Sequence, residues 1–317
     1  MLSIIKKTTK KMPYLRRFFS AGAPVESNPP PVESNPPSAK PCWVPPGHYY
    51  SPIPDVAELD RRQNMIWGSE PRSLPGIDLH TDSQFSLVCD LERYYRDQPF
   101  ERTKQTHLRY WFENAWFGSG DAILLHCLMR HLRPARILEV GSGFSSAAIL
   151  DTNDLFFHGR LNCTFIEPEP QRLLSLLTPE DQKRHRIIAA PLQDVELEPF
   201  RELQAKDILF IDTSHVVKTG GEVNRILFEI LPALSRGVYI HIHDIFYPFE
   251  YSKEWVFEGR SWNEIYALRA FLQYNTTFAI RLFNSYLVHR FTDWFRSHMP
   301  LCVECMGGGI WLEKMGD

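Results

Sequence analysis

The sequence predicts a doubly wound α/β domain with a seven-stranded, mostly parallel sheet, preceded by a helical and irregular N-terminal extension. From residue 136 onward, short apolar runs alternate with helical segments, as they do when helices connect parallel strands. The first run leads into a glycine turn, and the last run, GGGIWLEK, follows another. The chain has 317 residues, of which 44% are hydrophobic, so it can form one large core.

The apolar runs place the strands of this sheet. They lie at 136–140, 163–167, 186–190, 208–212, 238–242, 278–283 and 307–314. Helical spacing predicts a helix before the first strand, at 121–132, and helices between most of the strands, at 144–152, 170–177, 217–233 and 262–274. The late final strand predicts an antiparallel hairpin at one edge. In such sheets ligands bind at the carboxyl ends of the strands.

The chain divides into three parts. Residues 1–42 form a basic, proline-rich tail, residues 43–119 a lid or extension, and residues 120–317 the α/β domain. The tail contains the heptad PVESNPP twice, and a repeat so rich in proline and asparagine cannot bury a core. Within the extension, the spacing of apolar residues predicts helices over 81–97 and 104–116.

Composition and charge limit the kinds of partner that we expect the protein to bind. A net charge of −3 argues against a nucleic-acid partner, which normally needs a basic surface. No apolar run reaches the roughly 18 residues of a membrane span. The tail carries Lys6, Lys7, Lys10, Lys11, Arg16 and Arg17 without an acid before Glu26. It is either a solvated tail, a contact with an anionic membrane surface, or a transit-like segment.

The six cysteines indicate reduced, mostly buried thiols and a cytoplasmic location. Cys302 and Cys305 form one CxxC pair, but no second pair of ligands follows. Zinc needs four ligands, and thioredoxin-type chemistry needs the pair at the start of a helix after a strand. We therefore expect a structural pair.

The segment ARILEVGSGFSSAAIL, residues 135–150, indicates a nucleotide cofactor. A buried strand runs into Gly141-Ser142-Gly143 and then into a helix, so backbone N–H groups can approach a ligand closely. A dinucleotide fingerprint would have glycine or alanine where Ser146 stands. Further on, the strand Phe165-Ile166-Glu167 ends in an acid 26 residues after Gly141.

With these residues the sequence resembles the class I S-adenosylmethionine-dependent methyltransferases, whose first motif is acid-x-Gly-x-Gly. The resemblance covers about residues 120–317 and implies a Rossmann-like methyltransferase fold. It implies that Glu167 accepts hydrogen bonds from the ribose hydroxyls and that Asp194 contacts the adenine amino group. The cofactor-binding residues it implies are Glu139, Gly141, Ser142, Gly143, Glu167, Asp194 and Asp212.

Two further segments place the reaction centre. DILFIDTSH ends a strand with Asp212, and His215 follows three residues later; GVYIHIHDIF ends the next strand with His241, His243 and Asp244. Neighbouring parallel strands end at the same edge, so these side chains should converge, with His241 one layer deeper. Histidine, with an ordinary pKa of about 6.5, can accept a hydroxyl proton near neutral pH.

This arrangement resembles the metal-assisted small-molecule O-methyltransferases of the catechol and caffeoyl-CoA type, and also sugar O-methyltransferases that use a histidine base. The resemblance implies His215 as general base, with Asp212 beside it, and Asp212, His243 and Asp244 facing a divalent metal. The chain departs from the pattern, in which the base is usually Lys and the second pair Asp-Asn. A metal-free, hydrogen-bonded cluster stays open as the alternative.

The acceptor side is indicated only by aromatic residues. YPFEYSKEWV (247–256) and Trp262 follow the fifth strand, and Tyr49, Tyr50 and the 104–116 segment could form a lid. We expect a small-molecule or saccharide hydroxyl as acceptor. Two other functions stay open. One is an NAD-dependent oxidoreductase or epimerase, against which Ser146 and the lack of a Tyr-x-x-x-Lys pair count. The other is a non-catalytic binding module tethered by the tail.

Overall fold

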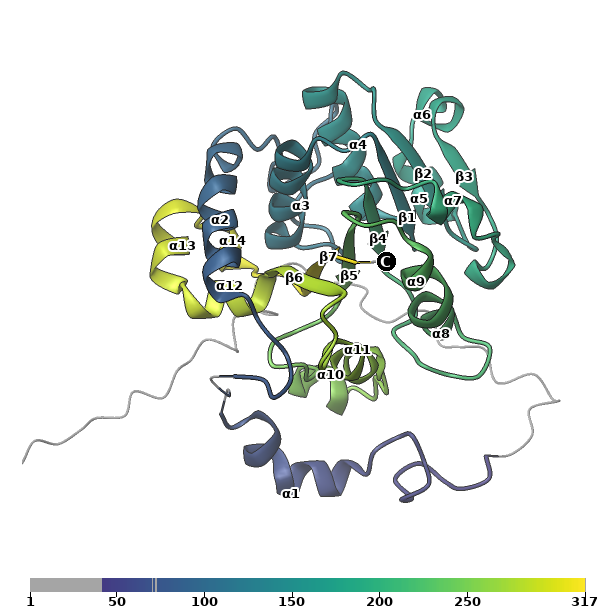
Figure 1. Ribbon diagram of the computed structural model, residues 1–317, viewed down its shortest axis with the longest axis vertical. Helices are drawn as coiled ribbons and strands as arrows, with labels where there is room; N and C mark the ends of the chain where they lie inside the picture. The colour runs from purple at the N-terminus through teal and green to yellow at the C-terminus, as the bar shows by residue number, and fades with distance from the viewer. Residues whose placement is uncertain (1–41, 70, 72, 317) are drawn as a thin grey trace, which may run out of the picture.

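A computed structural model describes residues 42–69, 71 and 73–316. The tail predicted for residues 1–42, with its repeated heptads, lies outside these residues apart from Cys42. The described chain folds around one seven-stranded sheet, which Figure 1 shows running through the middle of the molecule. Its strands are β1 (Arg136–Val140), β2 (Asn162–Ile166), β3 (Arg186–Ile188), β4 (Ile208–Ile211), β5 (Tyr239–His243), β6 (Phe278–Phe283) and β7 (Gly309–Lys314).

The strand order is β3-β2-β1-β4-β5-β7-β6. The pairs from β3 to β5 are parallel, and β7 runs antiparallel to both β5 and β6. The predicted hairpin therefore exists, with β6 at the edge and β7 inserted beside β5. The order in which the chain adds strands reverses between β1 and β4, and doubly wound sheets bind their ligands at such a switch point. The predicted fold class is confirmed.

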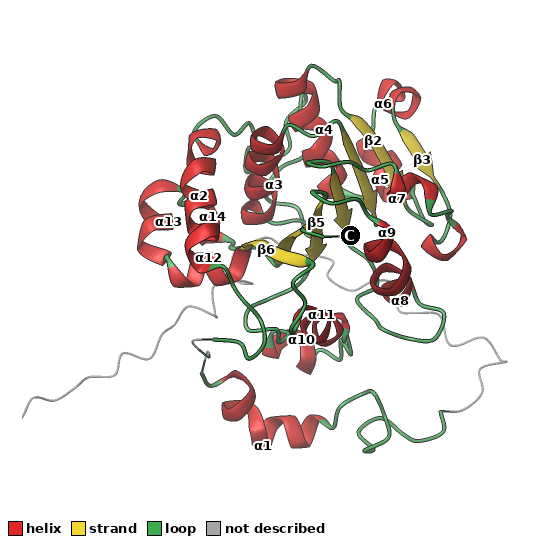
Figure 2. Ribbon diagram, in the orientation of Figure 1, coloured by secondary structure: helices red, strands yellow, loops and turns green. Residues whose placement is uncertain are grey.

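Helices fill the connections, as Figure 2 shows in red. The longer α-helices are α1 (Val56–Trp67), α2 (Thr81–Tyr95), α3 (Ser119–Leu132), α4 (Phe144–Phe157) and α11 (Glu264–Leu272). The shorter elements are α5 (Gln171–Leu176), α6 (Pro179–Arg184), η2 (Leu192–Asp194), α7 (Glu198–Arg201), α8 (Glu222–Arg225), η3 (Ile226–Ile230), α9 (Leu231–Ala233), α10 (Lys253–Phe257), α12 (Asn284–Arg290), α13 (Thr292–His298) and α14 (Leu301–Glu304).

The helices form layers on the sheet. Helix α3 packs between α2 and α4, and α4 packs on α5. Figure 1 shows α8 and α9 on the other side of β4 from α3 and α4. The strands between these layers are buried on both faces, which explains their continuous apolar sequences. Helix α1 has no buried residue, and the Trp67 indole donates a hydrogen bond to the carbonyl of Tyr251, 2.9 Å away.

The helix predicted over 104–116 is wrong, because this segment is irregular. Its backbone N–H groups at Arg109 and Tyr110 donate to the buried carboxylate of Asp151 on α4 instead of to carbonyls one turn earlier. The Asn114 side chain accepts from the N–H groups of Trp116 and Phe117. Side-chain partners of this kind compete with a helix.

Smaller differences concern the connections and the thiols. The helix predicted over 217–233 begins only at Glu222, and α12 to α14 were not predicted. All six cysteines are free; Cys127, Cys163 and Cys302 are buried as expected, whereas Cys42 and Cys89 are exposed. In the described part of the chain, no helix is long and apolar enough to cross a membrane.

Candidate active site

The turn after β1 depends on a close backbone approach at Gly141. Gly141 has φ +78° and its N–H donates to the carbonyl of Ile166 on β2. A β-carbon at this position would lie 1.6 Å from the carbonyl oxygen of Asp212, which follows β4. Only glycine fits both the conformation and this space. The turn is thereby fixed between the ends of β2 and β4.

Glu139 lies beneath this turn. Its side chain is fully buried and accepts hydrogen bonds from the hydroxyls of Ser145 (2.5 Å) and Ser146 at the start of α4. The Ser146 hydroxyl also accepts from the Gly143 N–H at 2.9 Å. Burial raises the pKa of Glu139 to about 8. Both carboxylate oxygens thus face the first turn of α4.

Glu167 stands at the rim of the turn. Its carboxylate accepts from the N–H of Ser142 at 3.0 Å and from the N–H of Glu169 at 2.9 Å, and the side chain is half-buried. Asp194 is exposed in η2, beyond the end of β3. The strand order places these acids after consecutive strands of the same sheet edge.

Arg172, which the sequence did not single out, and aromatic residues of the 104–116 segment lie beside the turn. The Arg172 guanidinium stacks on the Trp116 ring, 3.8 Å from its centre, and a β-carbon at Gly143 would lie 3.2 Å from Arg172 Cδ. Trp111 packs edge-on against Phe144 at 5.0 Å. The segment before α3 therefore lies against the glycine turn, on the side predicted for a lid.

The ends of β4 and β5 bring the predicted reaction-centre residues together. Ile211 pairs with Ile242, so Asp212 and His243 follow side by side. The Nε2 atom of His215 lies 3.4 Å from Asp212 Oδ1 and 3.5 Å from Asp244 Oδ2. Both His215 and Asp244 have positive φ, +59° and +54°. Non-glycine residues in this conformation concentrate at functional sites.

The acids and the histidine of this cluster shift one another's pKa values. Burial alone would lower the pKa of His215, but hydrogen bonds to Asp212 and Glu264 and the nearby Asp244 raise it well above the ordinary value. Burial alone would raise the pKa of Asp212, but the nearby His243 and His215 lower it. Burial raises the pKa of Asp244. The acids around the ring therefore favour the protonated form of His215.

The carboxylates and imidazoles of this cluster are paired with one another. Among residues 42–69, 71 and 73–316, no group of three or more His, Cys, Asp or Glu side chains is placed to hold a metal ion. His243 Nε2 lies 3.7 Å from Asp244 Oδ1, and the His215 ring stands between Asp212 and Asp244. The carboxylates that would bind the ion are thus paired with imidazoles. The metal site predicted at Asp212, His243 and Asp244 gains no support from this geometry.

A second polar layer lies below the cluster. His241 Nε2 is 3.3 Å from His243 Nδ1, which confirms that both point to the same face. Asp121 on α3 is buried and accepts from the Asn284 side chain (2.8 Å) and the Gly308 N–H (3.1 Å). Asp121 was not predicted, because its partners come from the C-terminal part of the chain.

The aromatic residues after β5 partly surround His215. The Trp262 ring lies 4.4 Å from the His215 ring, and Trp255 and Tyr251 pack on Trp262 at 5.3 Å and 5.9 Å. Tyr49 and Tyr50, predicted as part of a lid, are exposed, and their rings contact each other at a tilt of 48°. The Trp262 cluster is therefore the aromatic surface nearest to the predicted base among these residues.

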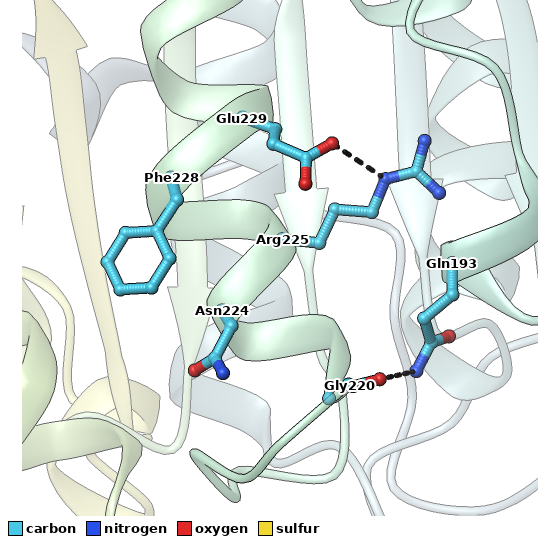
Figure 3. Close-up of a pocket in the computed structure, with 7 residues that line it drawn as sticks. Gln193, Gly220, Asn224, Arg225, Phe228 and Glu229 are labelled. Carbon is cyan, nitrogen blue, oxygen red and sulfur yellow. Dashed lines mark hydrogen bonds and ion pairs between the residues drawn. The ribbon is translucent and has the colours of Figure 1, made fainter.

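A separate pocket of about 330 Å³ lies beside η2. Figure 3 shows Gln193 bonded to the carbonyl of Gly220 and Arg225 paired with Glu229 along its walls. The pocket is lined by Gln193, Gly220, Gly221, Asn224, Arg225, Phe228 and Glu229. None of the histidines and aspartates of the reaction-centre cluster lines it, so this pocket is not where those residues act.

The glycine turn fits the nucleotide cofactor better than the cluster fits a metal. In the described chain, the buried hydroxyls of Ser142 and of Thr213, which follows Asp212, have no hydrogen-bond partner. Buried polar atoms normally have one. These two lie at the ends of β1 and β4, next to the backbone approach at Gly141. A ligand with hydroxyl and amino groups, held here, would satisfy them.

The segment that contains the predicted site residues matches the model of a known protein family. Residues 138–245 match the model of a family described as "Methyltransferase domain". An uncharacterised protein of Archaeoglobus fulgidus is 33% identical over 165 residues, which are 50% of this chain and 73% of that protein. The family match spans β1 to the end of β5 and so includes the glycine turn, Glu167, Asp194, Asp212, His215, His243 and Asp244.

Solved structures of methyltransferases resemble the chain more distantly. A Podospora anserina methyltransferase with bound S-adenosylhomocysteine is 16% identical with a TM-score of 0.40, covering 83% of this chain and 97% of that one. The O-methyltransferase TomG of Streptomyces achromogenes, bound to S-adenosylmethionine, is 12% identical with a TM-score of 0.41, covering 82% and 96%. Likeness at this level supports no inference about this chain.

The family match over residues 138–245 agrees with the resemblance carried by the glycine turn and Glu167. The chain belongs to the class I S-adenosylmethionine-dependent methyltransferases.

Proposed function

We propose that this enzyme methylates a hydroxyl group of a small molecule or saccharide, with His215 as the general base. The observation that carries the proposal is the placement of His215 Nε2 between Asp212 and Asp244, at the same sheet edge as the glycine turn and Glu167. A proton acceptor and a nucleotide-binding turn at one edge are what methyl transfer to a hydroxyl requires.

The residues that would hold the cofactor are Gly141, Ser142 and Gly143, with Glu167 at the ribose, Asp194 at the adenine and Asp212 beside the reacting end. Glu139 would act through the turn, since its carboxylate fixes the start of α4. When bound, S-adenosylmethionine supplies an electrophilic methyl group on a sulfonium centre. Trp262 and Tyr251 would exclude water from the acceptor side.

His215 accepts the proton of the acceptor hydroxyl at Nε2, and Asp212 and Asp244 stabilise the imidazolium that results. The same carboxylates favour the protonated ring, and only the neutral ring can accept a proton. A positively charged ligand beside Asp212 lowers the pKa of His215 by charge repulsion. We therefore expect activity to increase with pH above the ordinary histidine range.

Nothing in the described residues favours the two alternatives. The position that a dinucleotide fingerprint gives to its third glycine holds Ser146, whose buried hydroxyl bonds both Glu139 and Gly143. A binding module without catalysis has no use for a strained, buried histidine among three acids, a costly arrangement.

The variant His215→Asn tests the proposal. Transfer is measured as S-adenosylhomocysteine formed with panels of catechols and of sugars. We expect transfer to fall about 100-fold or more, while calorimetric affinity for S-adenosylhomocysteine changes little. His298→Asn, at an exposed position on α13, is the matched control. Undiminished turnover in His215→Asn with an accepted substrate would overturn the base assignment.

A further inference from the structure

We propose that Glu264 is a positioning residue that sets which nitrogen of His215 faces the reaction centre. It fixes the proton on Nδ1, so that Nε2 is the free nitrogen in the neutral ring. The inference rests on the proposed function, in which His215 is the base, but its geometry can be tested without an acceptor.

The contact between the two side chains is short and buried. Glu264 Oε2 lies 2.9 Å from His215 Nδ1, and the side chains are 4% and 5% exposed. A carboxylate accepts hydrogen bonds and has none to donate. The proton between them therefore belongs to Nδ1, and Nε2 carries the lone pair when the ring is neutral.

The two ring nitrogens face different surroundings. Nδ1 points to buried Glu264, whereas Nε2 points to Asp212 and Asp244, whose side chains are 33% and 18% exposed. The accessible side of the ring is thus the Nε2 side. A ring turned by half a rotation about its Cβ–Cγ bond would put Cε1 where Nε2 now stands and would remove Nδ1 from Glu264, so the hydrogen bond to Glu264 opposes that rotation.

The backbone next to Glu264 also contacts the backbone of His215. The N–H groups of Asn263 and Glu264 both donate to the carbonyl of His215 at 3.0 Å. The Asn263 side chain accepts from the Val217 N–H at 2.6 Å, and Trp262 lies against the imidazole. Residues 262–264, at the start of α11, form a collar on His215 that holds its left-handed backbone conformation.

An acidic side chain at position 264 is not needed merely to pack against the His215 ring. A buried acid is costly unless it is paired, and an apolar side chain would pack against a ring without that cost. Glu264 instead accepts a hydrogen bond from Nδ1, the ring nitrogen that faces away from Asp212 and Asp244. Pairing of this kind sets the tautomer and orientation of histidines at reactive sites.

The test is the tautomer of His215, observed by long-range ¹H–¹⁵N correlation on the full chain labelled with ¹⁵N-histidine. The His215→Asn spectrum identifies the signals, and pH is raised until the ring is neutral. We expect the wild type to carry its proton on Nδ1. Glu264→Gln, whose amide oxygen can still accept, should keep that tautomer, and Glu264→Leu should shift it mainly to Nε2–H.

The wild-type spectrum alone can overturn the proposal, even if Glu264→Leu does not fold. A proton on Nε2 in the wild type would do so, as would an unchanged tautomer in folded Glu264→Leu. S-adenosylhomocysteine binding by the same sample is measured separately. Failure of that binding would count against the proposed function and leave the tautomer result standing.

Discussion

The carbonyl oxygen of Asp212 occupies the space that a side chain at Gly141 would need. A β-carbon built on Gly141 lies 1.6 Å from this oxygen, and the Asp212 N–H donates to the carbonyl of Val140 at 2.8 Å. The cofactor turn after β1 and the reaction-centre acid after β4 are therefore one backbone unit. A substitution at either residue should therefore alter the backbone position of the other.

Gly141→Ala should weaken S-adenosylhomocysteine binding by at least about tenfold, equal to about 1.4 kcal/mol. The new methyl group forces the turn away from Asp212, and φ +78° is strained for alanine. Calorimetry measures the affinity. Gly259→Ala is the control, because Gly259 has φ +93° but no atom within 4 Å of its β-carbon position. Gly259→Ala should bind as the wild type does, and equal affinity in the two variants would contradict the predicted role of the Gly141 turn.

Glu167→Gln should reduce cofactor affinity about tenfold or more while leaving the melting temperature nearly unchanged. The amide has one accepting oxygen where the carboxylate has two, and both carboxylate oxygens already bond the turn and its flank. Glu169→Gln, at an exposed position two residues on, is the control and should bind as the wild type does. If both variants bind normally, Glu167 is not at the ribose.

Glu139 should make stability depend on pH. Burial raises its pKa from 4.5 to about 8, so the folded chain holds a proton that the unfolded chain releases. Its contribution to stability is complete below pH 4.5 and is lost as pH rises through about 8, by at most about 1.4 kcal/mol per pH unit. Glutamine cannot lose this proton. The stability of the wild type relative to Glu139→Gln, from denaturant unfolding, should fall with pH; parallel curves would contradict it.

Among the ion pairs of the segment before α3, those of Arg109 should contribute most to the free energy of unfolding. Its guanidinium pairs with Asp151 at 2.8 Å and Asp181 at 2.7 Å, and these acids are 0% and 1% exposed. Arg109→Leu leaves them without this cation and should cost about 3–5 kcal/mol in the free energy of unfolding. Arg102→Leu breaks only the exposed pair with Glu304 and should cost less than about 1 kcal/mol. Similar losses would show that the buried network adds little.

The strands were predictable because most of their residues are buried, so their sequences are mainly apolar. Local sequence also gave the glycine turn, since a strand, two glycines and a helix follow within a few residues. Glu167 and the acids and histidines after β4 and β5 were found because parallel strands end at one edge. These features depend on short-range patterns and one topological rule.

The remaining features depend on contacts between distant parts of the chain. The 104–116 segment has helical spacing, yet Asp151 takes its N–H groups from 41 and 42 residues away. Glu264 meets His215 across 49 residues, and nothing in its own surroundings marks it. The expected metal ligands lie together, but they pair with one another, which spacing cannot reveal.

The most direct test of the account is a calorimetric titration of the full chain with S-adenosylhomocysteine and, separately, with NADH. The account predicts saturable binding of one S-adenosylhomocysteine per chain, weakened in Gly141→Ala and Glu167→Gln, and no comparable binding of NADH. Saturable binding of NADH with no response to S-adenosylhomocysteine would contradict it.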